Sequence, residues 1–253
     1  HLAHRRQRQM CIRDRMKLII FLILSSLTLM ANTPSNRFNS KVKYEYNVYL
    51  EVLNLKLGEA SLSIKDPDNI EGINVYHLNF NVRTTKLGDS IYKIRNKIDV
   101  WINQENLNVV KQNKSIRELR KKKNSETIIR NQKGITNGKE FIVNENSFDP
   151  YSLILILSEF NIPNNQSRKF NIVDAGKSRV IEIKNLGTEV IKTPYGDKQG
   201  YTLSPVQNGQ PVLKNKGDME VIYAPIDDIL VPVRILIKLG SGVIELRLKK
   251  ILE

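Results

Sequence analysis

Residues 42–52 read VKYEYNVYLEV, and every second position from Val42 onward carries an apolar or aromatic side chain. Polar or charged residues stand at most of the positions between them. Successive side chains of a β-strand point to opposite faces, so a period of two over eleven residues predicts a strand with one buried face.

The same alternation recurs along the chain and predicts further strands. We expect these strands at residues 55–64, 76–82, 92–102, 170–173, 179–183, 189–193, 199–203 and 219–223. Gly58 is expected to mark a bulge or bend, and Asp66-Pro67-Asp68-Asn69 a turn. Residues 231–239 and 243–252, separated by Gly240-Ser241-Gly242, are typical of a hairpin.

One segment departs from the alternation. Asp149-Pro150 precedes an apolar run that continues to Phe160, and Asn161 and Pro163 follow it. Asp is a common N-cap and Pro suits the first helical position, so we expect a single helix of about three turns. Leu153 to Leu157 are all apolar and would face all round the helix, which is therefore expected to be buried or to cover a cavity.

Many strands with one helix predict an all-β protein, with an antiparallel curved sheet, a sandwich or a barrel as its architecture.

The N-terminal 31 residues are expected to be absent from the mature protein. Met16-Lys17 precedes thirteen uncharged, mostly apolar residues, Leu18 to Met30, and then Ala31. This order is typical of a signal peptide cleaved near Ala31. A membrane anchor is the alternative, but a span needs about 20 apolar residues. Residues 1–15 resemble a translated adapter, with an extended basic start of the signal as the alternative. Residues 32–253 are then one β-rich domain.

Charge and cysteine content narrow the class of protein. The chain has 40 basic and 26 acidic residues, a net charge of +14, and residues 32–253 keep 34 and 25, a net charge of +9. This excess is spread along the chain, so no nucleic-acid partner is expected. The single cysteine, Cys11, lies in the segment expected to be lost, so the core and not a disulfide holds the domain together.

No pattern predicts a catalytic or metal site. Residues 32–253 contain one histidine, His77, which is expected on the polar face of its strand. A lone histidine is more often a solvent-facing polar residue than the base of a serine–histidine–aspartate triad, and no second histidine offers an alternative base. A zinc site of the usual histidine and cysteine ligands cannot be assembled. Asp227-Asp228 and Asp66 with Asp68 are the nearest carboxylate pairs, and Asp227-Asp228 is expected to lie in a turn. No nucleotide-binding or calcium-binding loop is present, so no cofactor is expected.

A basic stretch is the main candidate for a binding surface. Residues 111–123 contain seven lysine and arginine residues against Glu118 alone. This stretch would contact anionic lipid, lipopolysaccharide or another acidic polymer. The favoured alternative is a solvated hairpin tip whose charges keep an edge strand from pairing. The candidate binding residues come from this stretch, from the preceding strand and from the helix: Arg120, Lys122, Trp101, Tyr151 and Leu155.

Five pieces of sequence, taken in their order along the chain, match the pattern of a known family. They are residues 46–64 with LGEA at 57–60, TTKLG at 84–88 leading to Tyr92, FDPYSL at 148–153, IKTPYG at 191–196, and residues 228–248. In this order the chain resembles the domain of unknown function 3108 family of bacterial exported proteins. It departs from the family where members often carry a Trp before the late acidic turn, because Tyr223-Ala224 stands here. The resemblance implies a β-rich fold, a periplasmic or outer-envelope location, and no activity or catalytic residue.

Three classes of function remain open. A non-enzymatic binding or envelope-maintenance protein for an amphiphilic or anionic envelope component, such as a lipid or polysaccharide, is favoured, because a curved sheet with an apolar helix can enclose an amphiphile. A carboxylate-based hydrolase or lyase acting on envelope glycan is one alternative, and carboxylates about 5 to 10 Å apart on a concave face would favour it. The other is a structural partner in an envelope complex, through the helix or an edge strand.

Overall fold

The computed structural model describes residues 41–207, 210–211, 219–239 and 242–252. The expected signal peptide, residues 1–15 and most of the expected Gly240-Ser241-Gly242 turn lie outside these residues. None of the helices in the described ranges is long and apolar enough to cross a membrane.

The strands in the described part are β1 (Val42–Leu50), β2 (Leu55–Ile70), β3 (Ile73–Thr84), β4 (Arg95–Asn103), β5 (Val109–Glu118), β6 (Lys121–Arg130), β7 (Lys133–Thr136), β8 (Lys139–Ile142), β9 (Ser147–Phe148), β10 (Ser167–Asp174), β11 (Lys177–Thr193), β12 (Gly196–Gln207), β13 (Gln210–Pro211), β14 (Met219–Ile226), β15 (Ile229–Leu239) and β16 (Gly242–Leu252). The helical elements there are the α-helices α2 (Lys86–Tyr92) and α3 (Pro150–Ile156) and the 3-10 turns η2 (Glu51–Leu53) and η3 (Leu157–Glu159).

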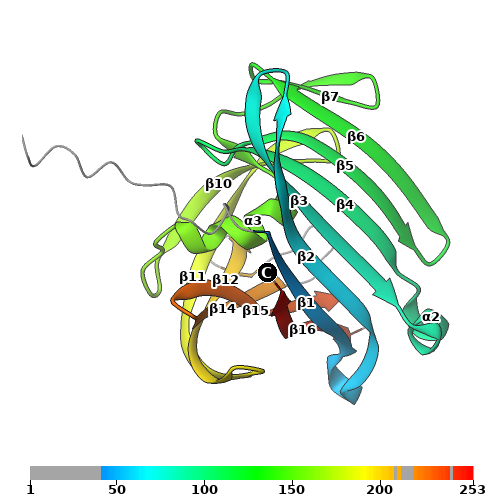
Figure 1. The fold of residues 1–253 in the computed structure, drawn as a ribbon, viewed down its shortest axis with the longest axis vertical. Coiled ribbons are helices and arrows are strands. Elements are labelled where there is room, and N and C mark those ends of the chain that lie inside the picture. The colour runs from blue at the N-terminus through cyan, green and yellow to red at the C-terminus, as the bar shows by residue number, and fades with distance from the viewer. Residues whose placement is uncertain (1–40, 208–209, 212–218, 240–241, 253) are drawn as a thin grey trace, which may run out of the picture. The chain divides into compact units, whose positions relative to one another are not determined.

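All of these strands belong to one large sheet, which curves around α3 without closing (Figure 1). The order is β8-β7-β6-β5-β4-β3-β2-β1-β16-β15-β14-β12-β11-β10-β9, with β13 beside β12. Neighbours are antiparallel except β9 and β10, which are parallel. β1 pairs with β16, which joins the first and last described strands. The expected all-β fold with an antiparallel curved sheet is therefore confirmed.

The alternating stretch that begins at Val42 forms β1, with the expected face buried. The side chains of Tyr44, Tyr46 and Val48 are almost completely shielded from solvent and belong to the core. The hydroxyl of Tyr46 donates a hydrogen bond to the carbonyl of Pro232 (2.8 Å), so its one polar atom is satisfied inside the core. β1 is thus held between β2 and β16 by its backbone and against the core by its apolar face.

Two expected boundaries are wrong. β2 runs through the expected turn at 66–69 to Ile70, with a register shift between Lys65 and Asp68. The chain reverses at Glu71-Gly72, where both residues have positive φ (52° and 86°) and glycine carries no steric penalty. The strands expected at 179–183 and 189–193 are one strand, β11, whose register shifts between Asn185 and Gly187.

The expectation of a single helix is also wrong, because α2 occupies Lys86–Tyr92, where a strand was expected to begin at Tyr92. The Thr85 side chain caps α2 by accepting a hydrogen bond from the Gly88 amide (3.2 Å). A Cβ at Gly88 would lie 2.1 Å from the carbonyl oxygen of Leu57, so glycine permits α2 to lie against β2.

The hairpin tip expected as the favoured alternative for the basic stretch is present as the turn between β5 and β6. The full extent of these two strands and the strands β7 and β8 were not expected, because their faces are largely polar and lack the apolar alternation that marks a half-buried strand.

The helix expected from Pro150 to Phe160 is present as α3 followed by η3. Asp149 is its N-cap, and its Oδ1 accepts hydrogen bonds from the amides of Tyr151 (2.7 Å) and Ser152 (3.2 Å). The helix lies on the concave side of the sheet (Figure 1), and the side chain of Leu155 is completely buried. The hydroxyl of Tyr223 donates to the carbonyl of Ile154 (2.7 Å), which ties β14 to the helix.

Candidate ligand-binding pocket

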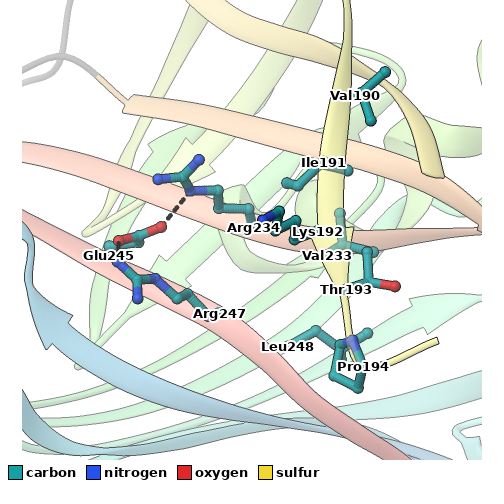
Figure 2. A pocket seen from close by; sticks show the side chains of 10 residues that line it. All are labelled: Val190, Ile191, Lys192, Thr193, Pro194, Val233, Arg234, Glu245, Arg247 and Leu248. Carbon is teal, nitrogen blue, oxygen red and sulfur yellow. Dashed lines mark hydrogen bonds and ion pairs between the residues drawn. The ribbon is translucent and has the colours of Figure 1, made fainter. Parts of the chain in front are cut away.

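A pocket of about 340 Å³ lies between the β11–β12 hairpin and strands β15 and β16 (Figure 2). Its lining comes from both sides: Val190, Ile191, Lys192, Thr193, Pro194, Val233, Arg234, Glu245, Arg247 and Leu248. The tip of the β11–β12 hairpin reaches β16, because the Tyr195 hydroxyl accepts a hydrogen bond from the Ile251 amide (2.9 Å). Gly196, at φ 89°, closes the tight turn that places this tip.

Arg234 of β15 and Arg247 of β16 are direct cross-strand partners. Like charges in such positions repel each other. Glu245 relieves the repulsion, since its Oε1 accepts from Arg234 Nε (Figure 2) and its Oε2 accepts from Arg247 Nη2 (2.5 Å). The Glu245 side chain is completely buried, while those of Arg234 and Arg247 stay 30% and 40% exposed. The arginines therefore present part of their charge to the pocket while the carboxylate holds them in place.

Glu245 and Arg247 hold each other in their ionised forms at neutral pH. Burial opposes ionisation of Glu245, but the hydrogen bonds and charges of Arg247 and Arg234 outweigh it and lower the pKa of Glu245. The hydrogen bond to Glu245 raises the pKa of Arg247 above its usual value. Arg247 is fixed further by donating to Asn54 Oδ1 (2.8 Å) and by stacking its guanidinium over the Tyr49 ring (4.4 Å).

The pocket is amphipathic and carries a net positive charge. Lys192 adds a third cation, so the lining contains three cations and the single carboxylate of Glu245. The remaining wall is largely apolar, with the buried side chains of Ile191, Val233 and Leu248 in it. A site of this kind suits a ligand with an anionic end and an apolar end.

Trp101, a predicted binding residue, lies on the polar face of the sheet in β4. Its ring stacks on His77 (centroids 4.4 Å apart, planes 13° apart), and Lys111 Nζ lies 5.5 Å from the ring centre. His77 faces Asp99, with Nε2 2.9 Å from Oδ1. The expectation that His77 lies opposite the buried face of β3 is confirmed, although its side chain is half-buried and not free in solvent.

Tyr151 and Leu155 lie in α3, as predicted, and pack inside the curved sheet. The Tyr151 ring lies 5.4 Å from that of Phe80 and 5.1 Å from Lys114 Nζ. Burial raises the pKa of the Tyr151 hydroxyl to about 12, although nearby Lys114 opposes the shift. Leu155 belongs to the apolar core.

Arg120 and Lys122 lie exposed at the connection between β5 and β6. The five predicted binding residues are thus distributed over the polar face, the core and one end of the sheet, and none of them lines the pocket. Asp227-Asp228 is an exposed turn between β14 and β15 with positive φ at both residues (47° and 62°), as the sequence indicated.

Sequence reasoning missed the pocket residues Lys192, Arg234, Glu245 and Arg247. The sequence gives only a weak signal for these residues, since charged residues at positions 245 and 247 are typical of the solvent-exposed face of the strand expected at 243–252. Only the fold, which places the β11–β12 hairpin beside β15 and β16, brings them together.

Lys114 was counted as part of the basic stretch, but the structure buries it in a second charged cluster. Its Nζ lies 2.6 Å from Asp149 Oδ2 and 3.0 Å from Asp174 Oδ1. Burial acts to lower the pKa of Lys114, but the two carboxylates outweigh it and raise that pKa. Beside it, Gln112 Nε2 donates to the carbonyl of Val173 (2.8 Å), so β5 and β10 are joined across the open side of the sheet.

The fold and the pocket define a one-sheet antiparallel β protein with an amphipathic, cationic surface site. The chain belongs to the family described as "Protein of unknown function (DUF3108)", whose model matches residues 45–249. A solved structure with a similar fold is the "Beta-barrel-like Protein of Domain of Unknown Function DUF1849 from Brucella abortus", with a TM-score of 0.50 and 10% sequence identity. The match covers 83% of this chain and 96% of that chain. No curated protein matches this chain.

Proposed function

We propose that this protein is a non-enzymatic binding protein of the bacterial envelope. We further propose that it holds an anionic amphiphile in the pocket between the β11–β12 hairpin and strands β15 and β16. The observation that carries the proposal is the pairing of cations with apolar walls around about 340 Å³. Arginine binds phosphate and carboxylate groups through paired hydrogen bonds, and the apolar wall contributes by removing ligand carbon from water. The volume is near the lower end of small-molecule sites, so one short acyl chain is the expected occupant.

Glu245 gives the pocket its preorganisation. It neutralises one of the two arginine charges and holds both guanidinium groups in fixed positions, so little ordering is left for ligand binding. The envelope location is part of the proposal, and the signal-like residues 16–31 and the family resemblance support it.

Titration with a fluorescent single-chain phosphatidylglycerol, kept below its micelle concentration, tests the proposal. We expect Arg234→Gln and Lys192→Gln each to weaken binding about tenfold, since each removes a charge-assisted contact. Lys198→Gln is the matched control, because Lys198 lies on the same hairpin but outside the pocket lining, and it is expected to bind like the unsubstituted protein.

The headgroup alone, as glycerol phosphate, is expected to bind more weakly than the single-chain lipid, because the apolar wall then has no partner. Absence of binding by the unsubstituted protein would refute the proposed function. Equal loss in Lys198→Gln and the pocket variants would place the ligand elsewhere.

A further inference from the structure

Three connections lie together at one end of the sheet: η2 between β1 and β2, α2 between β3 and β4, and the β5–β6 turn. Successive strands are antiparallel, so alternate connections meet at the same end, where Figure 1 shows α2 and the β1–β2 connection. The amide of Leu119 donates to the carbonyl of Lys93 (2.9 Å), and the amide of Thr85 donates to that of Leu57 (2.7 Å). These hydrogen bonds place the β5–β6 turn and β2 against the two ends of α2.

Each of these connections exposes large apolar side chains. They are between 45% and 77% exposed, and they are Val52, Leu53, Leu87, Ile91 and Leu119. Single exposed apolar residues need no explanation, but a group on adjacent connections at one end marks an interaction surface. We call these five side chains together with the exposed cations around them the sheet rim.

The cations of the sheet rim are numerous and exposed: Lys86, Lys93, Arg117, Arg120, Lys121, Lys122 and Lys123. The acidic side chains on these connections, Glu51, Asp89 and Glu118, are only half-exposed, and two of them are already occupied. Asp89 forms an ion pair with Arg95 (2.7 Å), and Glu118 accepts a hydrogen bond from Asn96 (2.7 Å). The surface that faces solvent here is therefore apolar and cationic.

Protection of an edge strand explains only part of this surface. Among the described strands, β7 pairs with β6 at residues 127–130, so the lysines at 121–123 do lie on a free edge. Arg117 lies directly across from Lys122, however, and like charges at paired positions destabilise a hairpin. Edge protection also gives no reason for the apolar residues on η2 and α2.

We propose that the sheet rim docks on the surface of an anionic lipid bilayer. Exposed aliphatic side chains enter the interface between headgroups and acyl chains, and surrounding lysines and arginines bind anionic headgroups. Charge complementarity selects this partner, since the rim combines both features on one end of the sheet. The docking goes beyond the pocket proposal and does not depend on it, although Arg247 of the pocket also contacts Asn54, next to Leu53.

Flotation of the mature protein with vesicles of phosphatidylethanolamine, with and without phosphatidylglycerol, tests the docking. We expect binding only when phosphatidylglycerol is present, and loss of binding at high salt. The charge variant Arg120→Gln/Lys122→Gln is expected to bind about 25-fold more weakly, at about fivefold for each charge. The apolar variant Val52→Ser/Leu53→Ser is expected to lose about tenfold or more.

Matched controls come from the opposite end of the sheet, where β6 to β8 lie beside the β2–β3 turn through the Arg130–Glu71 ion pair. Lys133→Gln/Lys139→Gln removes two exposed charges, and Ile135→Ser/Ile142→Ser removes two exposed apolar side chains. Both are expected to bind vesicles like the unsubstituted protein.

Equal binding with and without phosphatidylglycerol, or equal losses in the rim variants and their controls, would overturn the proposal. Binding to heparin but to neither kind of vesicle would also overturn it, in favour of a soluble polyanion. The rim variants are expected to keep full affinity for the single-chain lipid, and the pocket variants to keep full docking, so either proposal can fail without the other.

Discussion

Lys114 is the residue whose sequence context is most misleading. Six other basic residues surround it between positions 111 and 123, yet its side chain is only 7% exposed. It neutralises the fully buried Asp149, which also caps α3, and contacts Asp174 at the end of β10. A single cation therefore connects the middle of β5 with the helix and with β10, near the opposite edge of the sheet.

We expect Lys114→Met to destabilise the protein by about 3 kcal/mol or more, because it leaves the Asp149 carboxylate buried without a counterion. The midpoint of urea unfolding measures the loss. Lys111→Met on the same strand is the control: its partner Glu126 is 56% exposed, so its loss is expected to cost less than about 1 kcal/mol. Equal effects of the two substitutions would contradict the burial of Lys114.

The pH dependence of this contact follows from the raised pKa of Lys114. A group whose pKa is higher in the folded state stabilises the fold fully below its unfolded pKa, which is about 10.4 for lysine. The stabilisation is lost only as the pH rises beyond that value, so in the unsubstituted protein the contribution of ionised Lys114 is constant across neutral pH.

At the scale of elements, α3 is a short helix whose residues from Ser152 to Ile156 are all buried. A helix on the surface of a sheet needs only one apolar stripe. Here the curved sheet surrounds the helix, and Tyr223 anchors its backbone from β14. The additional apolar side chains of α3 are therefore explained by protein packing.

Leu155→Asp is expected to unfold the domain, since an unpaired carboxylate in the core costs several kcal/mol, on the order of the whole folding free energy. Far-ultraviolet circular dichroism and lipid titration distinguish the outcomes. Asn161→Asp introduces the same group at an exposed position just after η3 and is expected to be neutral. A folded Leu155→Asp protein that has lost lipid binding would show instead that the helix lines a ligand cavity.

At the scale of the whole molecule, one sheet contains all the described strands, and residues 32–253 contain no cysteine that could reinforce it. Stability has to come from the core and from the side chains that join β5 to β10 across the open side.

Expression from Met16 in a Gram-negative host tests the expected export. The protein should be found in the periplasmic fraction with an N-terminus close to Asn32. Ile20→Arg/Leu24→Arg places two charges in the apolar run and should leave the protein unprocessed. An unsubstituted protein that keeps Met16 and stays in the cytoplasm would rule out the signal peptide.

Local patterns were sufficient for much of the fold. The alternation of apolar and polar residues in a strand indicates which face is buried, so the burial of Tyr44, Tyr46 and Val48 was predictable without knowing the partner strands. The Asp149-Pro150 start of α3 was predictable for the same reason, since capping involves only neighbouring residues. The boundaries at Gly72 and the short helix α2 were not, because both depend on contacts with neighbouring strands.

The burial of charges was left to the tertiary structure. Lys114 and Glu245 have the sequence pattern of a solvated face, and nothing within a few residues shows that they are buried. The segments that pack beside them lie far away in the chain: Asp174 beside Lys114, and the β11–β12 hairpin beside Glu245. Desolvation depends on everything that surrounds a group in space, so it is settled only when distant segments come together.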